Sequence, residues 1–323
     1  MGFDDHQETT SVRIPTIDFS DVDLKAPTDA SRWNMVRLQV WEAVQEYGCF
    51  QATYGDLPQQ LRQAMDAAME EVFSLPVEAK RRNVSDKPLH GYIGSSPVMP
   101  LYESLGIDDP ETDHGVQSFT NVMWPSGHAK FSEIVLSFSK KLSELDQAIR
   151  RMLVESLGVE KKYMEEQLNS TCYQLRLTHY REPQTVQEKK VGLKAHVDQN
   201  TLTILHQNHV DGLDVQTRDG EWISVKFAPQ CFLVLVGESL NAWTNGRLQC
   251  PYHRVMIRGH KARLSAGLFA IPKQGYVVKA PKELVDEEHP MLFKPYDYID
   301  YLKLRSKEIG KSVESPLKAY FGV

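Results

Sequence analysis

The chain has 323 residues, of which 41% are hydrophobic, so it can build a large core in one or two domains. The net charge is −6, and no basic stripe of the kind that binds nucleic acid is present. No apolar run reaches the length of a membrane helix, and the acidic residues 1–6 lack a signal-peptide core. Four separated cysteines without a CxxC pair predict reduced thiols in a cytoplasmic protein: Cys49, Cys172, Cys231 and Cys250.

The N-terminal quarter predicts short strands alternating with helices. Residues 1–11 are polar, and we expect them to be disordered. An opening strand over residues 12–19 precedes a helix whose apolar positions recur between residues 33 and 47. Gly48 is a suitable stop for that helix, and residues 50–54 read as a second strand.

The next part predicts a helical layer. Pro58 lies near the first turn of a second amphipathic helix. Residues 86–99 are rich in Pro, Gly and Ser and therefore predict a loop, while residues 117–124 are interpreted as a strand. A long helix over residues 128–157 is expected to end at Gly158.

Strand patterns dominate the second half of the chain. They cover residues 173–180, 201–206, 212–217, 222–225, 232–236, 251–257 and 264–271. Short strands separated by turns are typical of a sandwich or barrel. A jelly roll covers its strand edges with two packed sheets and encloses a pocket. Residues 296–308 read as a helix that could lid this barrel.

Three residues are candidate ligands of a metal ion. His196 and Asp198 would share one face of a strand through residues 195–201, because positions two apart in a strand point the same way. His253, in a second strand-like run, can complete a face of two histidines and one carboxylate. Such a face leaves coordination positions open, which suits non-haem Fe(II) and oxygen chemistry.

A candidate anion site follows shortly after His253. Arg263 and Ser265 are two residues apart, so a strand would place a guanidinium and a hydroxyl on one face. An arginine can direct two donors at a carboxylate, and a hydroxyl can add a third. Residues 259–261 predict the turn of a hairpin that brings His253 close to this pair.

These motifs resemble the site of the plant-type 2-oxoglutarate- and Fe(II)-dependent dioxygenases. The resemblance covers most of the chain and includes GLKAHVD at 192–198, DGEW at 219–222, TNG at 244–246 and FKPY at 293–296. The segments YGCF at 47–50, KRRNV at 80–84 and ELVD at 283–286 are most similar to the AOP-like, glucosinolate side-chain-modifying subgroup. The auxin-oxidising dioxygenases are similar relatives.

The resemblance implies an α+β fold with a double-stranded β-helix core, which is a cupin-like jelly roll. The core would have an N-terminal helical part and flanking helices. Residues 12–323 would then form a single catalytic unit. Its parts are a mainly helical segment at 12–170, the jelly roll at 171–295 and a C-terminal helix or lid at 296–323.

The resemblance also implies the ligands. Fe(II) would be held by His196, Asp198 and His253, and 2-oxoglutarate would be the cosubstrate for reaction with O2, with ascorbate in support. Arg263 and Ser265 would bind the distal carboxylate of 2-oxoglutarate. Further cosubstrate contacts are expected from Tyr180 and, less clearly, from Thr178, which stands where the family has Asn.

Other positions near the site bear on the substrate. Phe269 matches a family position that packs on substrate, and Phe119 is a second candidate. Glu238 replaces the Asp of a family Asn-x-Gly-Asp motif. His206 and His209 are interpreted as loop histidines, because no third ligand accompanies them.

The leading hypothesis is an oxygenase that hydroxylates or otherwise oxidises a small plant specialised metabolite, with release of succinate and CO2. The alternatives are oxidation of an auxin-type hormone, an oxidase of this fold that omits 2-oxoglutarate, and a non-catalytic metabolite binder. The sequence predicts no nucleic-acid or membrane partner. It does not name the substrate or the oligomeric state.

Overall fold

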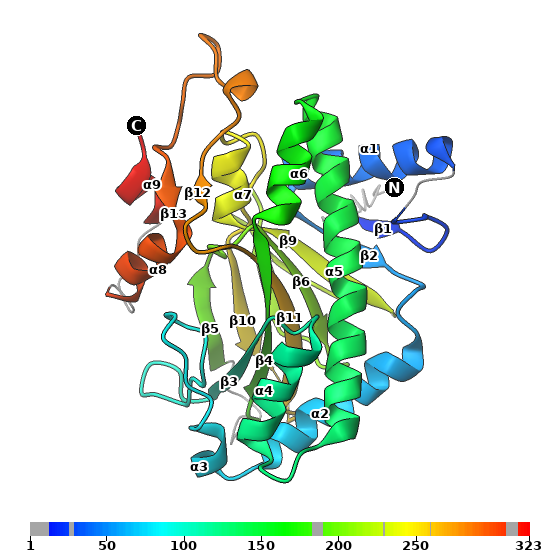
Figure 1. Ribbon diagram of the computed structural model, residues 1–323, viewed down its shortest axis with the longest axis vertical. Coiled ribbons are helices and arrows are strands. Elements are labelled where there is room, and N and C mark those ends of the chain that lie inside the picture. Colours follow the sequence, from blue (N-terminus) through cyan, green and yellow to red (C-terminus); the bar gives the residue numbers. More distant parts are fainter. Residues whose placement is uncertain (1–12, 26–28, 183–189, 229, 259, 308–315) are drawn as a thin grey trace, which may run out of the picture.

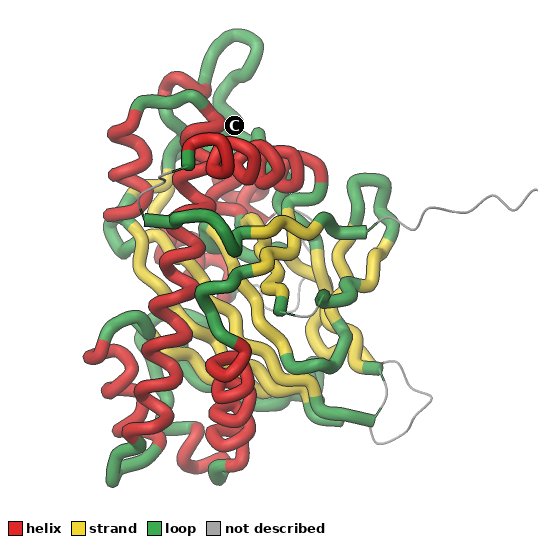
Figure 2. The backbone as a smooth tube through the Cα atoms, turned by 90° about the vertical axis from the view of Figure 1, so that its right-hand side faces the viewer, coloured by secondary structure: helices red, strands yellow, loops and turns green. Residues whose placement is uncertain are grey.

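The computed structural model describes residues 13–25, 29–182, 190–228, 230–258, 260–307 and 316–323. Two β-sheets face each other, and most of the helices lie against the outer face of the larger sheet (Figures 1 and 2). This arrangement confirms the predicted α+β fold with a jelly-roll core. The disorder expected for residues 1–11 lies outside the described residues.

The larger sheet has seven strands in the order β1, β2, β9, β6, β11, β4 and β3. Their bounds are Thr16–Asp18, Cys49–Thr53, Cys231–Val236, Leu202–Gln207, Arg263–Pro272, Thr171–Tyr180 and Tyr102–Asp108. The smaller sheet has the order β5, β10, β7 and β8, with bounds Lys190–His196, His253–Ile257, Leu213–Gln216 and Trp222–Ser224. A separate pair joins β12 (Val277–Val278) to β13 (Tyr296–Asp297).

The helix layer is built around α5 (Ala129–Leu157), which crosses the outer face of the larger sheet (Figure 1). Its start and end agree with the prediction. His128 accepts a hydrogen bond from the Phe131 backbone N–H at 3.1 Å, and Gly158 adopts a left-handed conformation that ends the helix. The helices α1 (Ala30–Glu46), α2 (Gln59–Ser74), α4 (Asp113–Met123) and α6 (Lys161–Asn169) contact it.

The remaining helices are short. They are α3 (Val77–Lys80), α7 (Glu238–Trp243), the 3₁₀ turn η1 (Lys282–Leu284), α8 (Tyr298–Ser306) and α9 (Pro316–Phe321). Both α8 and α9 come from the C-terminal segment, and Figure 1 shows them together beside the β12–β13 pair. The helix expected over residues 296–308 is therefore present as α8.

The strand predicted over residues 117–124 is wrong, because this segment belongs to α4. The Thr112 hydroxyl accepts a hydrogen bond from the Gly115 N–H at 3.0 Å and so caps the helix start. Val116, Phe119 and Met123 are buried at spacings of three and four residues, which place them on one helical face.

Alternation along β4 and β11 separates the hydrophobic core from the interior of the jelly roll. On one face, Leu175, Leu177, Ala266 and Leu268 belong to the core beneath the helices. The opposite face of each strand points between the two sheets. Tyr180 pairs with Arg263 and Thr178 with Ser265 in the register of these strands, so the polar side chains predicted for the site are direct neighbours.

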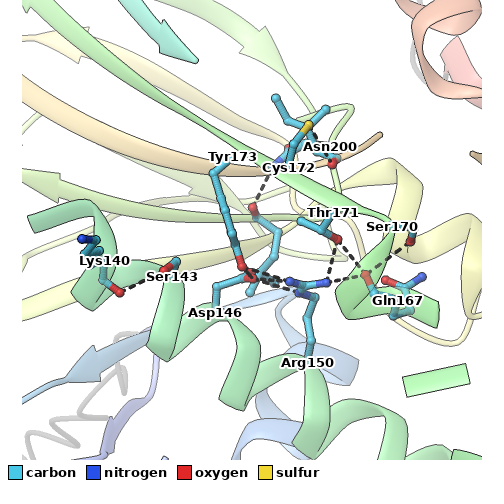
Figure 3. A network of polar contacts seen from close by, with 12 residues as sticks. Lys140, Ser143, Asp146, Arg150, Gln167, Ser170, Thr171, Cys172, Tyr173 and Asn200 are labelled. Carbon is cyan, nitrogen blue, oxygen red and sulfur yellow. Dashed lines mark hydrogen bonds and ion pairs between the residues drawn. The ribbon is translucent and has the colours of Figure 1, made fainter. Parts of the chain in front are cut away.

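A buried polar network ties α5 to α6 and β4 (Figure 3). The Arg150 guanidinium donates to Asp146 Oδ2 from Nε at 2.9 Å and from Nη2 at 2.6 Å. The Tyr173 hydroxyl donates to the same carboxylate oxygen at 2.8 Å. Nη1 of Arg150 donates to the Gln167 carbonyl and the Thr171 hydroxyl. These bonds fix the helix layer against the sheet.

Candidate functional site

The three candidate metal ligands converge at one end of the jelly-roll interior. Each of His196, Asp198 and His253 offers one ligand atom, and these atoms lie within 4.8 Å of one another. The two histidines are cross-strand neighbours in the β5–β10 pair. Their Nε2 atoms lie 3.6 Å and 3.7 Å from Asp198 Oδ1. This is the one such group of three among the residues that the structure describes.

The predicted strand through residues 195–201 is wrong beyond its first two positions, because β5 ends at His196. Asp198 lies in the following irregular segment, where its carbonyl accepts a hydrogen bond from the Glu238 N–H at 2.8 Å. The Thr203 hydroxyl donates to Asp198 Oδ2 at 2.7 Å and so orients the carboxylate. Local hydrogen bonds therefore place Asp198 beside His196. The sequence analysis assigned no role to Thr203.

Both histidines are held in the tautomer that a metal requires. Nδ1 of His196 lies 2.8 Å from the Lys194 carbonyl, and Nδ1 of His253 lies 3.1 Å from the Pro251 carbonyl. A carbonyl only accepts, so each Nδ1 carries a proton, and Nε2 is the ring atom left to bind a metal. Burial, together with the neighbouring His253, lowers the pKa of His196 to about 4. The His196 imidazole is therefore neutral at neutral pH.

A cavity of about 80 Å³ adjoins these ligands and contains all four predicted cosubstrate residues in its lining. They are Arg263, Ser265, Tyr180 and Thr178. Arg263 is 1% exposed, and its guanidinium carbon lies 5.3 Å from the centre of the Tyr180 ring. Burial lowers the pKa of Arg263, an effect that Tyr180 partly opposes. No carboxylate pairs with this guanidinium within the described parts of the chain.

A neutral amide, which the sequence analysis did not single out, holds Arg263 in place. Gln207 Oε1 accepts hydrogen bonds from Arg263 Nε at 3.1 Å and from Nη2 at 2.8 Å. Nη1 of Arg263 lies 3.4 Å from the Ser265 hydroxyl. Gln207 is paired with Ser265 in the β6–β11 register. The Nη1 side of the guanidinium thus remains available to a ligand in the cavity.

The predicted hairpin between His253 and Arg263 is wrong. His253 begins β10 in the smaller sheet, whereas Arg263 begins β11 in the larger sheet, and the two strands do not pair. Part of the predicted turn, Gly259, lies outside the described residues. Both side chains nevertheless line the same cavity, because the two sheets face each other across it.

A second cavity of about 230 Å³ opens beside the ligand group and shares His196, Asp198 and Phe269 with the first. The predicted loop at residues 86–99 contributes to its lining, and so do Tyr298 and Leu302 of α8. Phe269, one of the two substrate candidates, therefore faces both cavities. Helix α8 therefore forms part of the wall of this cavity, and its role as a lid stays a prediction.

The structure does not bring Phe119 to this site. Phe119 lies in α4, is 5% exposed and stacks on Phe131 with ring centres 5.8 Å apart. It belongs to the core of the helix layer. His206 is likewise occupied elsewhere, since its Nε2 lies 2.8 Å from Asp66 Oδ1. The interpretation of His206 as a loop histidine is wrong, because this residue lies buried in β6.

Two imidazoles and one carboxylate beside an open cavity fit a ferrous ion, because this donor set occupies one face of the metal. A jelly roll that carries such a donor set and a buried arginine defines the class of non-haem iron oxygenases. Residues 170–272 match the family model of the 2OG-Fe(II) oxygenase superfamily. Residues 14–126 match the model of the non-haem dioxygenase N-terminal region, described from morphine synthesis.

Curated relatives cover nearly the whole chain. "Probable 2-oxoglutarate-dependent dioxygenase AOP1.2" of Arabidopsis thaliana is 46% identical over 317 residues, which are 97% of each chain. "Probable inactive 2-oxoglutarate-dependent dioxygenase AOP2" of the same plant is 33% identical and covers 97% of this chain and 98% of that protein. The chain belongs to the 2OG-Fe(II) oxygenase superfamily, whose members use Fe(II) and 2-oxoglutarate.

Solved structures agree with this assignment. The crystal structure of the rice dioxygenase for auxin oxidation superposes with a TM-score of 0.80 at 29% identity, over 96% of this chain and 100% of that chain. No helix in the described part of this chain is both long enough and apolar enough to cross a bilayer.

Proposed function

We propose that this 2-oxoglutarate- and Fe(II)-dependent oxygenase hydroxylates or otherwise oxidises a small plant specialised metabolite. The convergence of His196, Asp198 and His253 beside a cavity with a buried arginine carries the proposal. The similarity to the AOP-type dioxygenases supports a specialised metabolite as the class of substrate.

We assign Fe(II) to Nε2 of His196, a carboxylate oxygen of Asp198 and Nε2 of His253. The carbonyls that accept from both Nδ1 atoms orient the rings, so Nε2 is the atom of each ring that faces Asp198. The Thr203 hydroxyl occupies Oδ2 of Asp198, which leaves Oδ1 for the metal. With three protein ligands on one face, the opposite positions remain for cosubstrate and oxygen.

The distal carboxylate of 2-oxoglutarate is assigned to Arg263 and Ser265, with Tyr180 and Thr178 as further contacts. Arg263 is buried without a carboxylate partner in the described structure, so a ligand carboxylate would supply its missing counter-charge. Charge-assisted hydrogen bonds of this kind are about twice as strong as neutral ones. Gln207 fixes the guanidinium before the ligand arrives, which reduces the ordering needed on binding.

The net reaction converts substrate, O2 and 2-oxoglutarate into oxidised substrate, succinate and CO2. Bound iron supplies the activation of oxygen. The protein residues hold the substrate C–H bond near the metal and limit the access of water. The cavity of about 230 Å³, with Phe269, Leu193 and Met99 among its lining residues, suits a small and largely apolar substrate.

The decisive assay measures succinate from purified protein supplied with Fe(II), 2-oxoglutarate, ascorbate, oxygen and a plant metabolite extract. We expect succinate above the background without extract, and extract components that are consumed only when 2-oxoglutarate is present. An Asp198→Ala variant should remain folded and lose this activity. Absence of extract-dependent succinate from well-folded, iron-loaded wild-type protein would contradict the proposal.

The same experiments separate the alternatives. An auxin-type hormone as substrate predicts that auxin alone replaces the extract. An oxidase that omits 2-oxoglutarate would consume substrate without forming succinate. A non-catalytic binder predicts no charge-transfer band when Fe(II) and 2-oxoglutarate are added without oxygen.

We also propose that the enzyme works in the cytoplasm. All four cysteines are free thiols, as expected in a reducing compartment. A fluorescent fusion of the full chain expressed in plant cells tests the location, and a signal confined to an organelle would contradict it.

A further inference from the structure

Arg176 lies in the wall shared by the two cavities of the candidate site. It stands on β4 between Gln174 and Thr178, on the face that points between the sheets. Arg176 lines both the cavity beside Arg263 and the larger cavity beside Phe269. Its guanidinium is therefore positioned where a substrate in the larger cavity would approach the metal ligands.

The partners of Arg176 leave its charge uncompensated. Nη1 donates to the Ser104 hydroxyl at 2.7 Å, and Nη2 donates to the Leu89 carbonyl. Both acceptors are neutral, and no ion pair to Arg176 exists among the described residues. An arginine has five N–H donors, so these bonds leave three of them available.

The surroundings of Arg176 do not supply a spare negative charge. Asp108, a half-buried carboxylate on the neighbouring strand β3, lies 2.6 Å from His90 and 3.6 Å from Lys87, and Gln174 donates to it. In the loaded site, the charges of Fe(II), Asp198, 2-oxoglutarate and Arg263 cancel. Arg176 then remains as the excess positive charge facing the cavity, which favours an anionic group on the substrate.

Glycines on both neighbouring strands shape the space beside Arg176. Gly106 and Gly267 are its cross-strand partners. A Cβ at Gly106 would lie 1.8 Å from the His90 carbonyl oxygen, so only glycine lets the loop that carries Leu89 pack here. A Cβ at Gly267 would lie 2.9 Å from the Phe269 ring, so that ring lies over the backbone next to Arg176. A cationic group and an apolar ring thus adjoin each other in the wall.

We infer that Arg176 is a specificity-determining residue that binds a carboxylate of the substrate, while Phe269 packs against the apolar part. The substrate class is accordingly a small organic acid with an apolar body. This inference rests on the proposed function, because it concerns the substrate of the same site. The planar guanidinium suits a carboxylate, to which it can donate two parallel hydrogen bonds.

A purely structural role is the competing explanation. Arg176 could serve only to hold the Leu89 loop through Ser104 and the Leu89 carbonyl. In that case its replacement would weaken the binding of acids and of uncharged analogues equally. A substrate contact instead predicts a loss confined to acids, so matched pairs of probes distinguish the two roles.

The test uses 3-phenylpropionic acid and decanoic acid, each paired with its methyl ester. Binding to the anaerobic protein loaded with Fe(II) and 2-oxoglutarate is measured by equilibrium dialysis. The charge-transfer band of the loaded protein reports that the site is intact. We expect wild-type protein to bind at least one acid roughly tenfold more tightly than its ester. Arg176→Gln should remove this preference and leave ester binding and the band unchanged.

Two further variants serve as controls. Arg176→Lys keeps the charge but loses the planar fork, and we expect it to retain part of the preference for acids. Arg254→Gln is the matched control, because Arg254 is an arginine of the smaller sheet already paired with Asp214 at 3.1 Å. It should leave the preference unchanged.

The outcomes are distinct. Equal affinity for acids and esters in wild-type protein overturns the inference, and so does a preference for acids that survives in Arg176→Gln. A wild-type protein that gives no charge-transfer band with Fe(II) and 2-oxoglutarate contradicts the proposed function itself. A normal band without a preference for acids contradicts only the role of Arg176.

Discussion

Two arginines of this protein, Arg150 and Arg263, are each only 1% exposed, yet their surroundings differ. Arg150 donates twice to the Asp146 carboxylate within the network that joins α5, α6 and β4 (Figure 3). Arg263 is held by the neutral amide of Gln207 and has no carboxylate partner in the described residues. Burial is the same in the two places, but only one of the charges is neutralised by the fold.

The pKa values of the two arginines shift in opposite directions because of this difference. Burial acts to lower the pKa of both arginines. At Arg150 burial is the largest single cause, but the charges and hydrogen bonds of Asp146 and Tyr173 together outweigh it, and the pKa is raised. At Arg263 burial prevails, and the pKa is lowered. A buried guanidinium without an internal counter-ion is costly for the folded state, so its presence in a cavity indicates a site for an anionic ligand.

The largest expected effect is on stability, from Arg150→Met. This change leaves the Asp146 carboxylate buried without its cation, which typically costs about 3–5 kcal/mol. Urea denaturation should show a lower free energy of unfolding, whereas the dissociation constant for 2-oxoglutarate should not change. Arg151→Met is the control, because Arg151 donates to the Leu24 carbonyl and no carboxylate is recorded for it in the described structure. An equal loss in both variants would contradict the structural role of the Arg150–Asp146 pair.

Arg263→Met should weaken the binding of 2-oxoglutarate without lowering stability, which is the reverse of the result expected for Arg150→Met. The variant loses the charge-assisted bonds to the distal carboxylate, worth about 3 kcal/mol, so the dissociation constant for 2-oxoglutarate should rise about a hundredfold. Its stability in urea should be unchanged or higher, because a buried charge without a counter-ion has been removed. Anaerobic titration of the charge-transfer band measures the first quantity. Unchanged cosubstrate affinity would show that the carboxylate binds elsewhere.

Glu103 extends the comparison to a carboxylate whose negative charge is compensated by neighbouring side chains. Burial alone would raise its pKa, but hydrogen bonds from His179, Lys80 and Tyr92 lower it to about 2, from an ordinary value of 4.5. The Lys80 ammonium lies 2.8 Å from Glu103 in a largely buried pair. Because the folded-state pKa lies below the unfolded value, this stabilisation is present above pH 4.5 and is lost as the pH falls towards 2.

Glu103→Gln should therefore lower the free energy of unfolding by about 2 kcal/mol at pH 7. The difference from wild type should shrink as the pH falls below 4.5. Urea denaturation at a series of pH values measures it, with Glu165→Gln as an exposed control on α6. A difference that does not depend on pH would show that the ionised form of Glu103 contributes nothing.

The sequence predicted which residues gather at the candidate site more completely than it predicted the strands and loops that carry them. Candidate ligands can be recognised by residue type and spacing, so His196, Asp198 and His253 could be proposed from the motif alone, and the structure brings them together. Their placement depends on tertiary contacts. Asp198 is set by Thr203 and Glu238 rather than by a strand, and β10 and β11 join different sheets although a turn pattern separates them.

Side chains without a motif could not be found in this way. Gln207 and Arg176 became visible only through the strand register, which pairs them with Ser265 and Gly267 of β11. The assignment of Phe119 to the substrate site was wrong because its sequence pattern is ambiguous. An aromatic residue on an amphipathic helix shows the same pattern in a core as beside a substrate. Strand register and packing, which are properties of the folded chain, decide these cases.

The smallest predicted effect is on the binding of 2-oxoglutarate in Gln207→Glu. This variant tests the comparison of the two arginines most directly, because it would give Arg263 a carboxylate partner such as Arg150 already has. Gln207 Oε1 now accepts two hydrogen bonds from Arg263, and a carboxylate in the same place would neutralise the guanidinium. We expect about tenfold weaker binding of 2-oxoglutarate, equivalent to about 1.4 kcal/mol, in anaerobic titrations. Gln207→Leu removes the acceptor without adding charge and should weaken binding less. If the glutamate variant bound 2-oxoglutarate as tightly as wild type, the missing counter-charge of Arg263 would not be what attracts the cosubstrate.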